Sequence, residues 1–200
     1  MRTASADRSP ASVTDPNGLW GYPGGRFLLS MQSLILVGMM GSGKSTIGRT
    51  IADLAEVPFH DLDRVIARNL GHSVPWLFER LGEQTFRDHE ANELRQLPDE
   101  PCVIATGGGV VLREDNWTEM RRRGKVVWLR ASLEVLAPRL ERGRMRRPLL
   151  AHDDWQDRVK AILDARTPIY SQADCIVDVT EEEPEQVAKQ VMEACAWPSP

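Results

Sequence analysis

One stretch constrains this chain more than any other: Gly-Met-Met-Gly-Ser-Gly-Lys-Ser-Thr at residues 38–46. An apolar run at 34–37 precedes it, and a helical pattern at 47–55 follows it. A strand, a glycine-rich loop ending in Gly-Lys-Ser and then a helix are the context of a phosphate-binding loop, or P-loop. Glycines let backbone N–H groups approach a phosphate closely, because no Cβ atoms stand between them. The helix N-terminus then faces the anion, so the sequence predicts a nucleotide site here.

Side chains of this loop carry specific predictions. Lys44 is expected to reach the β- and γ-phosphates of ATP, and the Ser45 hydroxyl to ligate Mg²⁺. The alternative is a glycine turn between strand and helix that binds no ligand. An accidental Lys-Ser pair at this offset is improbable, so the P-loop interpretation is favoured. The expected ATP-binding residues of the loop are Gly41, Ser42, Gly43, Lys44, Ser45 and Thr46.

The chain has 200 residues, of which 42% are hydrophobic and 27% charged, and this fits one globular domain. Its net charge of −4 argues against nucleic acid as a partner. The three cysteines show no metal-ligand spacing, and their odd number fits a reducing compartment. No apolar stretch approaches the roughly 20 residues that span a bilayer, so we expect no membrane partner.

Residues 1–30 are rich in Ser, Pro, Gly and Asp and lack hydrophobic periodicity. This composition predicts a disordered N-terminal tail rather than part of a core. The segment also lacks the positive start and apolar centre of a secretory signal. Met31 stands immediately before the first apolar run, so the folded domain is expected to occupy 31–200.

Two acids, Asp61 and Asp63, close a short segment that begins at Val57. We predict a strand there, and residues two apart in an extended chain point to the same side. Two carboxylates aimed at a phosphate site would allow one to support Mg²⁺ and the other to contact the phosphoryl acceptor. The alternative is that Asp63 is only the N-cap of a helix over 64–70.

A helix is predicted over 74–81, and Gly82 is expected to open a second helix that runs to about Leu97. Within the second helix, Arg87 and Glu90 are three residues apart, so they share a helical face and can pair. On spacing alone, a surface ion pair is as good an interpretation of this pair as a functional one.

A buried strand over 102–105 leads into Thr106 and three glycines at 107–109. Glycines at the carboxyl end of a parallel strand suit close approach of the backbone to a ligand, although a plain tight turn is the alternative. Arginines then crowd residues 139–147. A basic, glycine-containing loop suits a lid over phosphates, which we place at about 142–153, while a solvated charge run is the alternative.

The remaining segments continue an alternation of strands and helices. Such alternation predicts an α/β protein with a parallel sheet covered by helices on both faces. Ligands of such sheets bind beyond the carboxyl ends of the strands, where the P-loop, the two acids and the triple glycine should converge. The other predicted helices lie at 116–123, 132–142, 155–166 and 185–194, and the other predicted strands at 125–130 and 175–177.

Together these residues resemble those of shikimate kinase, a small member of the P-loop group that includes nucleoside monophosphate kinases. The resemblance covers nearly the whole chain after the tail. A P-loop alone would indicate only a nucleotide-using enzyme, whereas the combination and order of the motifs are much more specific. The matching motifs are Gly-Met-Met-Gly-Ser-Gly-Lys-Ser-Thr, Asp-Leu-Asp, Gly-Glu-Gln-Thr-Phe-Arg, Gly-Gly-Gly, Arg-Pro-Leu-Leu and Arg-Thr-Pro-Ile-Tyr.

The resemblance implies the three-layer P-loop NTPase fold, with a five-stranded parallel sheet of order 2-3-1-4-5 and a mobile lid. It implies transfer of the ATP γ-phosphoryl group to the 3-hydroxyl of shikimate in aromatic amino acid biosynthesis, with Mg²⁺ as cofactor. Lys44, Asp63 and Arg147 match the catalytic positions, and Arg147 is also the lid arginine over the ATP phosphates. Which of Arg139, Arg142 and Arg144 lies near adenine stays open.

The resemblance also assigns the acceptor and metal sites. Asp63 matches the acid that contacts the acceptor hydroxyl, and Gly108 matches a backbone contact to shikimate. Arg87 and Arg166 match the arginines that hold the shikimate carboxylate. Asp61 matches an acid near Mg²⁺ that acts through water, and Ser45 is the direct metal ligand.

Two other functions are weighed against this one. A related small-molecule kinase, such as a gluconate kinase, should lack the set formed by Asp63, Arg87 and Arg166. A non-catalytic nucleotide- or shikimate-binding module is disfavoured because Lys44 and Arg147 are also present. The expected partners are therefore ATP, ADP and shikimate, and a cytoplasmic monomer is the default expectation.

Overall fold

The computed structural model describes residues 32–142, 150 and 153–197, and the backbone of three short strands before them. The chain divides into two units, Met1–Met31 and Gln32–Pro200. In the first unit, successive antiparallel pairings join β1 (Val13–Thr14), β2 (Trp20–Tyr22) and β3 (Arg26–Phe27). The sequence composition predicts a disordered tail at 1–30 and does not predict these three strands.

The second unit is built on a five-stranded sheet in which every neighbouring pair is parallel. The strand order is β5-β6-β4-β7-β8, which is 2-3-1-4-5 when the strands of this unit are counted along the chain. The predicted order is therefore confirmed. The strands are β4 (Ser33–Val37), β5 (Phe59–Asp61), β6 (Val103–Ala105), β7 (Gly124–Arg130) and β8 (Cys175–Asp178).

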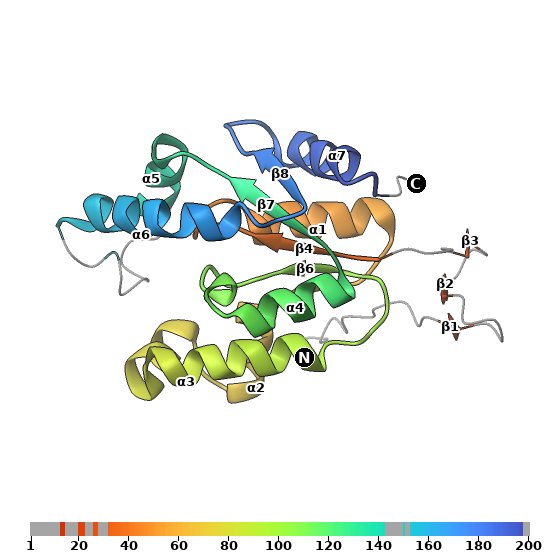
Figure 1. Ribbon diagram of the computed structural model, residues 1–200, viewed down its shortest axis with the longest axis horizontal. Helices are drawn as coiled ribbons and strands as arrows, with labels where there is room; N and C mark the ends of the chain where they lie inside the picture. The colour runs from red at the N-terminus through yellow and green to blue at the C-terminus, as the bar shows by residue number, and fades with distance from the viewer. Residues whose placement is uncertain are drawn as a thin grey trace, which may run out of the picture. The chain divides into compact units, whose positions relative to one another are not determined.

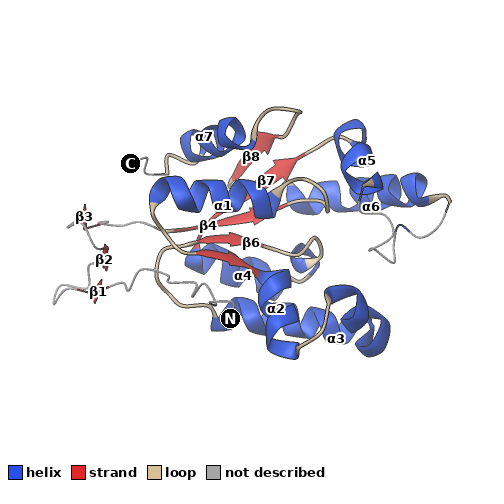
Figure 2. Cartoon of the chain, turned by 180° about the vertical axis from the view of Figure 1, so that it is seen from behind, coloured by secondary structure: helices blue, strands red, loops and turns tan. Residues whose placement is uncertain are grey.

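Helices cover both faces of this sheet, as the alternation predicts. The helix α1 (Lys44–Ala55) packs on β4, β5 and β6 and against α7 (Pro184–Ala194), while α4 (Glu114–Arg123) packs on β4 and β7. Figure 1 shows α4 in front of the sheet, and Figure 2, seen from behind, shows α1 in front. The other helices are α2 (Leu62–Leu70), α3 (Val74–Gln96), α5 (Leu133–Glu141), α6 (Trp155–Tyr170) and the 3₁₀ turn η1 (Val110–Leu112).

The central strands are buried on both sides, which explains their continuous apolar sequences. All five residues of β4 and all three of β6 are buried. A core cluster joins apolar side chains of β4, β6 and β7 to Trp117 of α4 and Tyr170 of α6. A smaller cluster of Ile66, Leu77 and Phe86 joins α2 to α3. The carboxyl ends of the strands are thus held on a rigid support.

Among the helix boundaries that differ from the sequence predictions, those of α1, α3 and α6 differ most. The helix α1 begins at Lys44, so the last residues of the P-loop motif form its first turn. One helical segment spans both helices predicted at 74–97, but Gly82 has φ 80° and ψ 164°, which breaks the helix where the sequence placed the junction. The helix α6 continues through Pro168 to Tyr170 instead of ending at Arg166. Burial of the Tyr170 side chain favours this extra turn.

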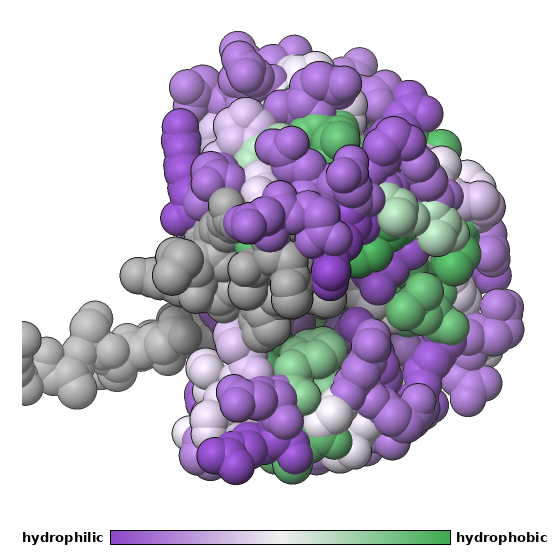
Figure 3. All heavy atoms as spheres, turned by 90° about the vertical axis from the view of Figure 1, so that its left-hand side faces the viewer, coloured by the Kyte–Doolittle hydropathy of each residue, from purple (hydrophilic) through white to green (hydrophobic). Residues whose placement is uncertain are grey.

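One face of the molecule can be judged for the polarity of its described residues. Figure 3 shows a face dominated by hydrophilic side chains, with hydrophobic ones gathered in a few groups. The four large apolar side chains most exposed in the described part of the chain are Trp76, Leu81, Leu112 and Ile176. Within that same part, no helix combines the length and the apolar character needed to cross a membrane.

Candidate active site

The P-loop joins β4 to α1 through a backbone that requires glycine. Gly38, Gly41 and Gly43 have φ values of 142°, 83° and 93°, a region that other residues rarely adopt. A Cβ atom on Gly38 would lie 2.7 Å from the carbonyl oxygen of Leu129 in the neighbouring strand. The first turn of α1 starts at Gly43, whose carbonyl accepts a hydrogen bond from the Ile47 N–H at 2.8 Å. The N-terminal end of α1 therefore follows directly on the loop.

Lys44 folds back along this loop. Its side chain is buried, and Nζ donates to the carbonyl oxygens of Gly38 at 2.8 Å and Met39 at 2.9 Å. The Ser42 hydroxyl is also buried and has no hydrogen-bond partner among the described residues. A buried ammonium, a helix N-terminus and glycine backbone together make an anion-binding loop.

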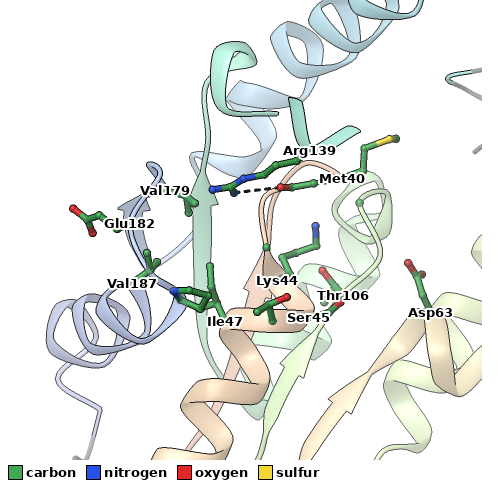
Figure 4. Close-up of a pocket in the computed structure, with 15 residues that line it drawn as sticks. Met40, Lys44, Ser45, Ile47, Asp63, Thr106, Arg139, Val179, Glu182 and Val187 are labelled. Atoms are coloured by element: carbon green, nitrogen blue, oxygen red, sulfur yellow. Dashed lines mark hydrogen bonds between the residues drawn. The ribbon is translucent and has the colours of Figure 1, made fainter. Parts of the chain in front are cut away.

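A cavity of about 590 Å³ lies over the loop. Figure 4 shows Lys44, Thr106 and Asp63 reaching this cavity from three different elements. Every predicted ATP-binding residue of the loop except the buried Ser42 lines it, namely Gly41, Gly43, Lys44, Ser45 and Thr46. The predicted P-loop residues are therefore brought together at one cavity.

The far end of the same cavity is lined by Arg139 and by the connection from β8 to α7. Arg139 donates through Nη2 to the Thr180 carbonyl at 2.7 Å and through Nη1 to the Gly41 carbonyl at 3.5 Å. Arg142 is exposed and is not among the cavity residues, and Arg144 lies outside the described residues. Of the three arginines left open by the sequence, the structure places Arg139 at this cavity.

The two acids predicted on one strand belong to different elements. Asp61 ends β5 and caps α2, because its Oδ1 accepts a hydrogen bond from the Arg64 N–H at 3.3 Å. Asp63 lies in the first turn of α2. The predicted extended geometry over 57–63 is therefore wrong, and the capping role foreseen as an alternative for Asp63 falls to Asp61. Asp63 faces the cavity, whereas Asp61 does not line it.

A second cavity, of about 480 Å³, adjoins the first. Met40, Asp63 and Gly108 line both, so the two cavities meet at these residues. The second cavity has apolar walls from α3 and α6, including Val74, Phe78 and Ile162. It also contains the two predicted carboxylate-binding arginines, Arg87 and Arg166.

Arg87 is held between two glutamates of its own helix. Nη1 bonds the buried Glu90 carboxylate, which confirms the predicted pairing, and Nη2 bonds Glu83 Oε1 at 3.1 Å. The Glu83 side chain is 63% exposed, while that of Glu90 is fully buried. Arg87 Nε is buried without a partner among the described residues. The guanidinium thus lines the cavity from a fixed position.

Glu90 has an unusual environment for a carboxylate. Its pKa is raised to about 7, chiefly by burial and in part by neighbouring Asp63, while Arg87 and Arg166 act in the opposite direction. Its Oε1 has no hydrogen-bond partner among the described residues. A carboxyl group with these properties carries a proton for a substantial part of the time near neutral pH.

The triple glycine lies where side chains from α2 and α3 approach the backbone. A Cβ on Gly107 would overlap Glu90 Oε1 and lie 2.7 Å from Asp63 Oδ1, and a Cβ on Gly109 would overlap the Arg87 guanidinium. Gly108 has ordinary space around its Cβ position, at 3.6 Å from the Met40 nitrogen. Side chains of the protein itself therefore approach this loop closely, whereas the predicted approach to a ligand stays a prediction.

Arg166 and Tyr170, one helical turn apart on α6, both bond the same backbone group. Arg166 Nη1 donates to the Gly108 carbonyl at 2.8 Å, and the Tyr170 hydroxyl donates to it at 2.9 Å. Burial raises the pKa of Tyr170, so its phenol keeps the proton that it donates. These bonds fix the loop at 107–109 beside both cavities.

Other predicted positions lie elsewhere. Arg147 and most of the predicted lid at 142–153 lie outside the described residues. No cluster of three or more His, Cys, Asp or Glu side chains suited to a metal occurs in the described part of the chain. Ser45, whose hydroxyl is a hard oxygen donor, nevertheless lines the first cavity. Such a donor fits Mg²⁺, which prefers oxygen ligands and retains several waters.

Sequence reasoning missed several residues of the site. Tyr170 stands in the matching motif Arg-Thr-Pro-Ile-Tyr, but no role was assigned to it. Glu83 precedes Arg87 by one helical turn, and that spacing could have identified it as a second partner. Thr106, whose hydroxyl donates to the Leu36 carbonyl at 2.9 Å, follows directly on the predicted strand.

Comparisons with known proteins agree with this geometry. The family model described as shikimate kinase matches residues 40–196. A shikimate kinase of Trichormus variabilis is 41% identical over 168 residues, covering 83% of this chain and 92% of that protein. One from Synechococcus sp. is 43% identical over 162 residues, covering 80% and 83% of the two chains.

Solved structures give the same result. The shikimate kinase from Acinetobacter baumannii in complex with shikimate has a TM-score of 0.78 at 32% identity, covering 82% of this chain and 92% of that one. The shikimate kinase from Bacteroides thetaiotaomicron has a TM-score of 0.76 at 35% identity, covering 82% and 98%. By its family model, its relatives and its fold, this chain belongs to the shikimate kinase family.

Proposed function

We propose that this protein transfers the γ-phosphoryl group of ATP to the 3-hydroxyl of shikimate, forming shikimate 3-phosphate and ADP in aromatic amino acid biosynthesis. One observation carries the proposal beyond family membership: Asp63 lines both the cavity over the P-loop and the cavity that contains Arg87 and Arg166. A phosphoryl acceptor has to be held where the phosphate site meets the carboxylate-binding site, and Asp63 lies at that junction.

The nucleotide binds over the start of α1. Its phosphates accept hydrogen bonds from the loop N–H groups, with Lys44 as a neighbouring positive charge, and the first cavity provides room for the whole nucleotide. The base lies at the far end, between the Arg139 guanidinium and the apolar surface of Val179 and Pro184. Arg139 suits this position because its bonds to two backbone carbonyls hold its planar group in place.

Ser45 would hold Mg²⁺ directly, and Asp61 would act through water. The cap geometry of Asp61 uses Oδ1, and its Oδ2 lies 3.7 Å from Arg64 Nε, so this acid is already engaged within the protein. Support for its metal role therefore comes only from the sequence motif. When bound with ATP, the ion would neutralise part of the negative charge of the phosphates.

Shikimate occupies the second cavity. Arg87 and Arg166 bind its carboxylate, because guanidinium groups match carboxylates in shape and charge. The backbone at Gly108 contacts the ring hydroxyls, with its carbonyl already held by Arg166 and Tyr170. Asp63 orients the 3-hydroxyl toward the γ-phosphate and accepts its proton as the new bond forms.

The rest of the assignment follows from the sequence. Residues 31–200 form the catalytic domain, and residues 142–153 form a lid whose Arg147 neutralises charge on the phosphates and whose closure excludes water. The protein acts as a cytoplasmic monomer. Support for these points comes from the motif Arg-Arg-Pro-Leu-Leu at 146–150 and from the composition of the chain.

ADP release from Mg·ATP, measured in a coupled assay, tests the proposal. Shikimate should stimulate ADP release strongly, whereas gluconate at equal concentration should not. Stimulation by gluconate alone would instead identify a gluconate-kinase-like enzyme. Binding of both ATP and shikimate without any phosphate transfer would identify a non-catalytic module and overturn the proposal.

A further inference from the structure

The guanidinium of Arg87 already bonds two carboxylates of its own protein, although its proposed role is to bind the carboxylate of a substrate. Glu90 and Glu83 bind its two terminal nitrogens, and both glutamates line the same cavity as the guanidinium. Nε and Nη2 together form one edge of the group, which could hold a substrate carboxylate with two parallel bonds. Nε is buried without a partner among the described residues, and Nη2 is bonded to Glu83.

The two glutamates differ in how easily each could be separated from the Arg87 guanidinium. The Glu90 side chain is fully buried, so separating it from Arg87 would leave a buried polar group without its partner. The Glu83 side chain is 63% exposed and lies 3.1 Å from Nη2, so water can replace Arg87 as its partner. Glu83 also follows Gly82 directly, where the helix is broken and positive φ allows a change of direction.

We propose that Glu83 occupies the substrate-carboxylate position on Arg87 and is exchanged for the carboxylate of the acceptor. Because of this exchange, an anion binds Arg87 only if its contacts compensate for the loss of the pair between Glu83 and Arg87. A simple carboxylate must displace Glu83 with a single group, whereas a hydroxylated acceptor adds contacts at Asp63 and Gly108. Arg87 meanwhile stays oriented by Glu90. This inference rests on the proposed function for the identity of the acceptor.

The substitution Glu83→Gln removes the charge and keeps the size. Exposed ion pairs of this kind shift an equilibrium by roughly two- to fivefold, so the KM for shikimate should fall about threefold. The inhibition constant of benzoate, a ring carboxylate without hydroxyls, should fall by a similar factor. The KM for ATP should not change. Glu79→Gln is the matched control, because Glu79 is an exposed glutamate of the same helix that does not line the cavity.

Several results would overturn the exchange. An unchanged or higher shikimate KM in Glu83→Gln would mean that Glu83 supports Arg87 instead of competing with its ligand. An equal fall in Glu79→Gln would mean that any nearby negative charge has the effect. If wild type fails to phosphorylate shikimate, the proposed function fails, but calorimetric titration of both variants with benzoate still decides the exchange. Tighter benzoate binding by Glu83→Gln alone would support it.

Discussion

The Tyr170 hydroxyl donates a hydrogen bond to the carbonyl oxygen of Gly108 over 2.9 Å. This bond joins the last turn of α6 to the loop that follows β6, and the two residues are 62 positions apart in sequence. Because the same carbonyl also accepts a hydrogen bond from Arg166, the orientation of the Arg166 side chain is coupled to the conformation of the glycine loop.

Tyr170→Phe should weaken shikimate binding more than turnover. Loss of one hydrogen bond costs about 1 kcal/mol, which corresponds to a rise of about fivefold in the shikimate KM if all of it is lost from binding. The melting temperature should fall by about 2–4 °C for a chain of this size. Ser171→Ala is the control, since it removes a side-chain bond to the Pro168 carbonyl at the same helix end. An equal change in KM in both variants would show a general effect on α6.

Asp63→Ala should nearly abolish turnover while leaving nucleotide binding intact. The variant loses the group that orients the acceptor hydroxyl and takes its proton, and such groups contribute about 10²–10⁴-fold to rate. Steady-state kinetics should show that fall in kcat with the ATP KM within about twofold of wild type. Asp53→Ala, at an exposed position on α1, should behave as wild type. Unchanged turnover in Asp63→Ala would refute the assigned role.

The parts of the site that could be predicted from sequence are those with local signals. The P-loop and the triple glycine each follow an apolar strand directly, and parallel topology brings strand ends together. Which acid caps α2 depends on where this helix begins. It begins two residues earlier than predicted, so Asp61 is the cap instead of Asp63. The Tyr170 bond could not be predicted, because it depends on how α6 packs against a distant loop.

The position of Arg139 is a second feature that the sequence could not predict. Several arginines in one segment have the same local pattern, and only the packing of α5 beside the P-loop distinguishes the one that reaches the Gly41 carbonyl. Charge composition indicated that a polyanion would be handled there. It could not indicate which side chain would line the cavity.

Gly109→Ala should raise the shikimate KM by about tenfold or more by displacing Arg87, a loss comparable to that of a charged hydrogen bond. Gly109 has φ −108° and ψ 0°, so alanine brings no positive-φ strain, but its Cβ would overlap the guanidinium. The ATP KM should remain unchanged in the same kinetic assay. If the effect acts through Arg87, adding Gly109→Ala to Arg87→Ala should change nothing further. Additive losses in this cycle would contradict the explanation.

Asp61→Asn separates the two roles considered for this acid. Asparagine caps helices about as well as aspartate, so the melting temperature should stay within about 1 °C of wild type. If Asp61 also supports Mg²⁺ through water, the Mg²⁺ concentration for half-maximal activity should rise severalfold, because the negative charge is lost. An unchanged Mg²⁺ dependence would contradict the metal role and leave Asp61 as a helix cap that bonds the Arg64 N–H.

Glu90→Gln should change how stability depends on pH. Burial raises the pKa of Glu90 from 4.5 in its ordinary state to about 7 in the folded protein. Below pH 4.5 the carboxyl is protonated in both states, and the stability that depends on this proton is fully present. Between about pH 4.5 and 7 the unfolded chain releases the proton while the folded chain keeps it, so stability falls as the pH rises.

The effect is measured as a difference between two proteins. The free energy of unfolding of wild type minus that of Glu90→Gln should fall by about 3 kcal/mol between pH 4.5 and 7.5, since each pKa unit is worth about 1.4 kcal/mol. Urea denaturation at several pH values gives this difference, and Glu79→Gln should show no such trend. A difference that does not vary with pH would mean that Arg87 keeps Glu90 ionised in the folded protein, so that the buried pair carries no proton at neutral pH.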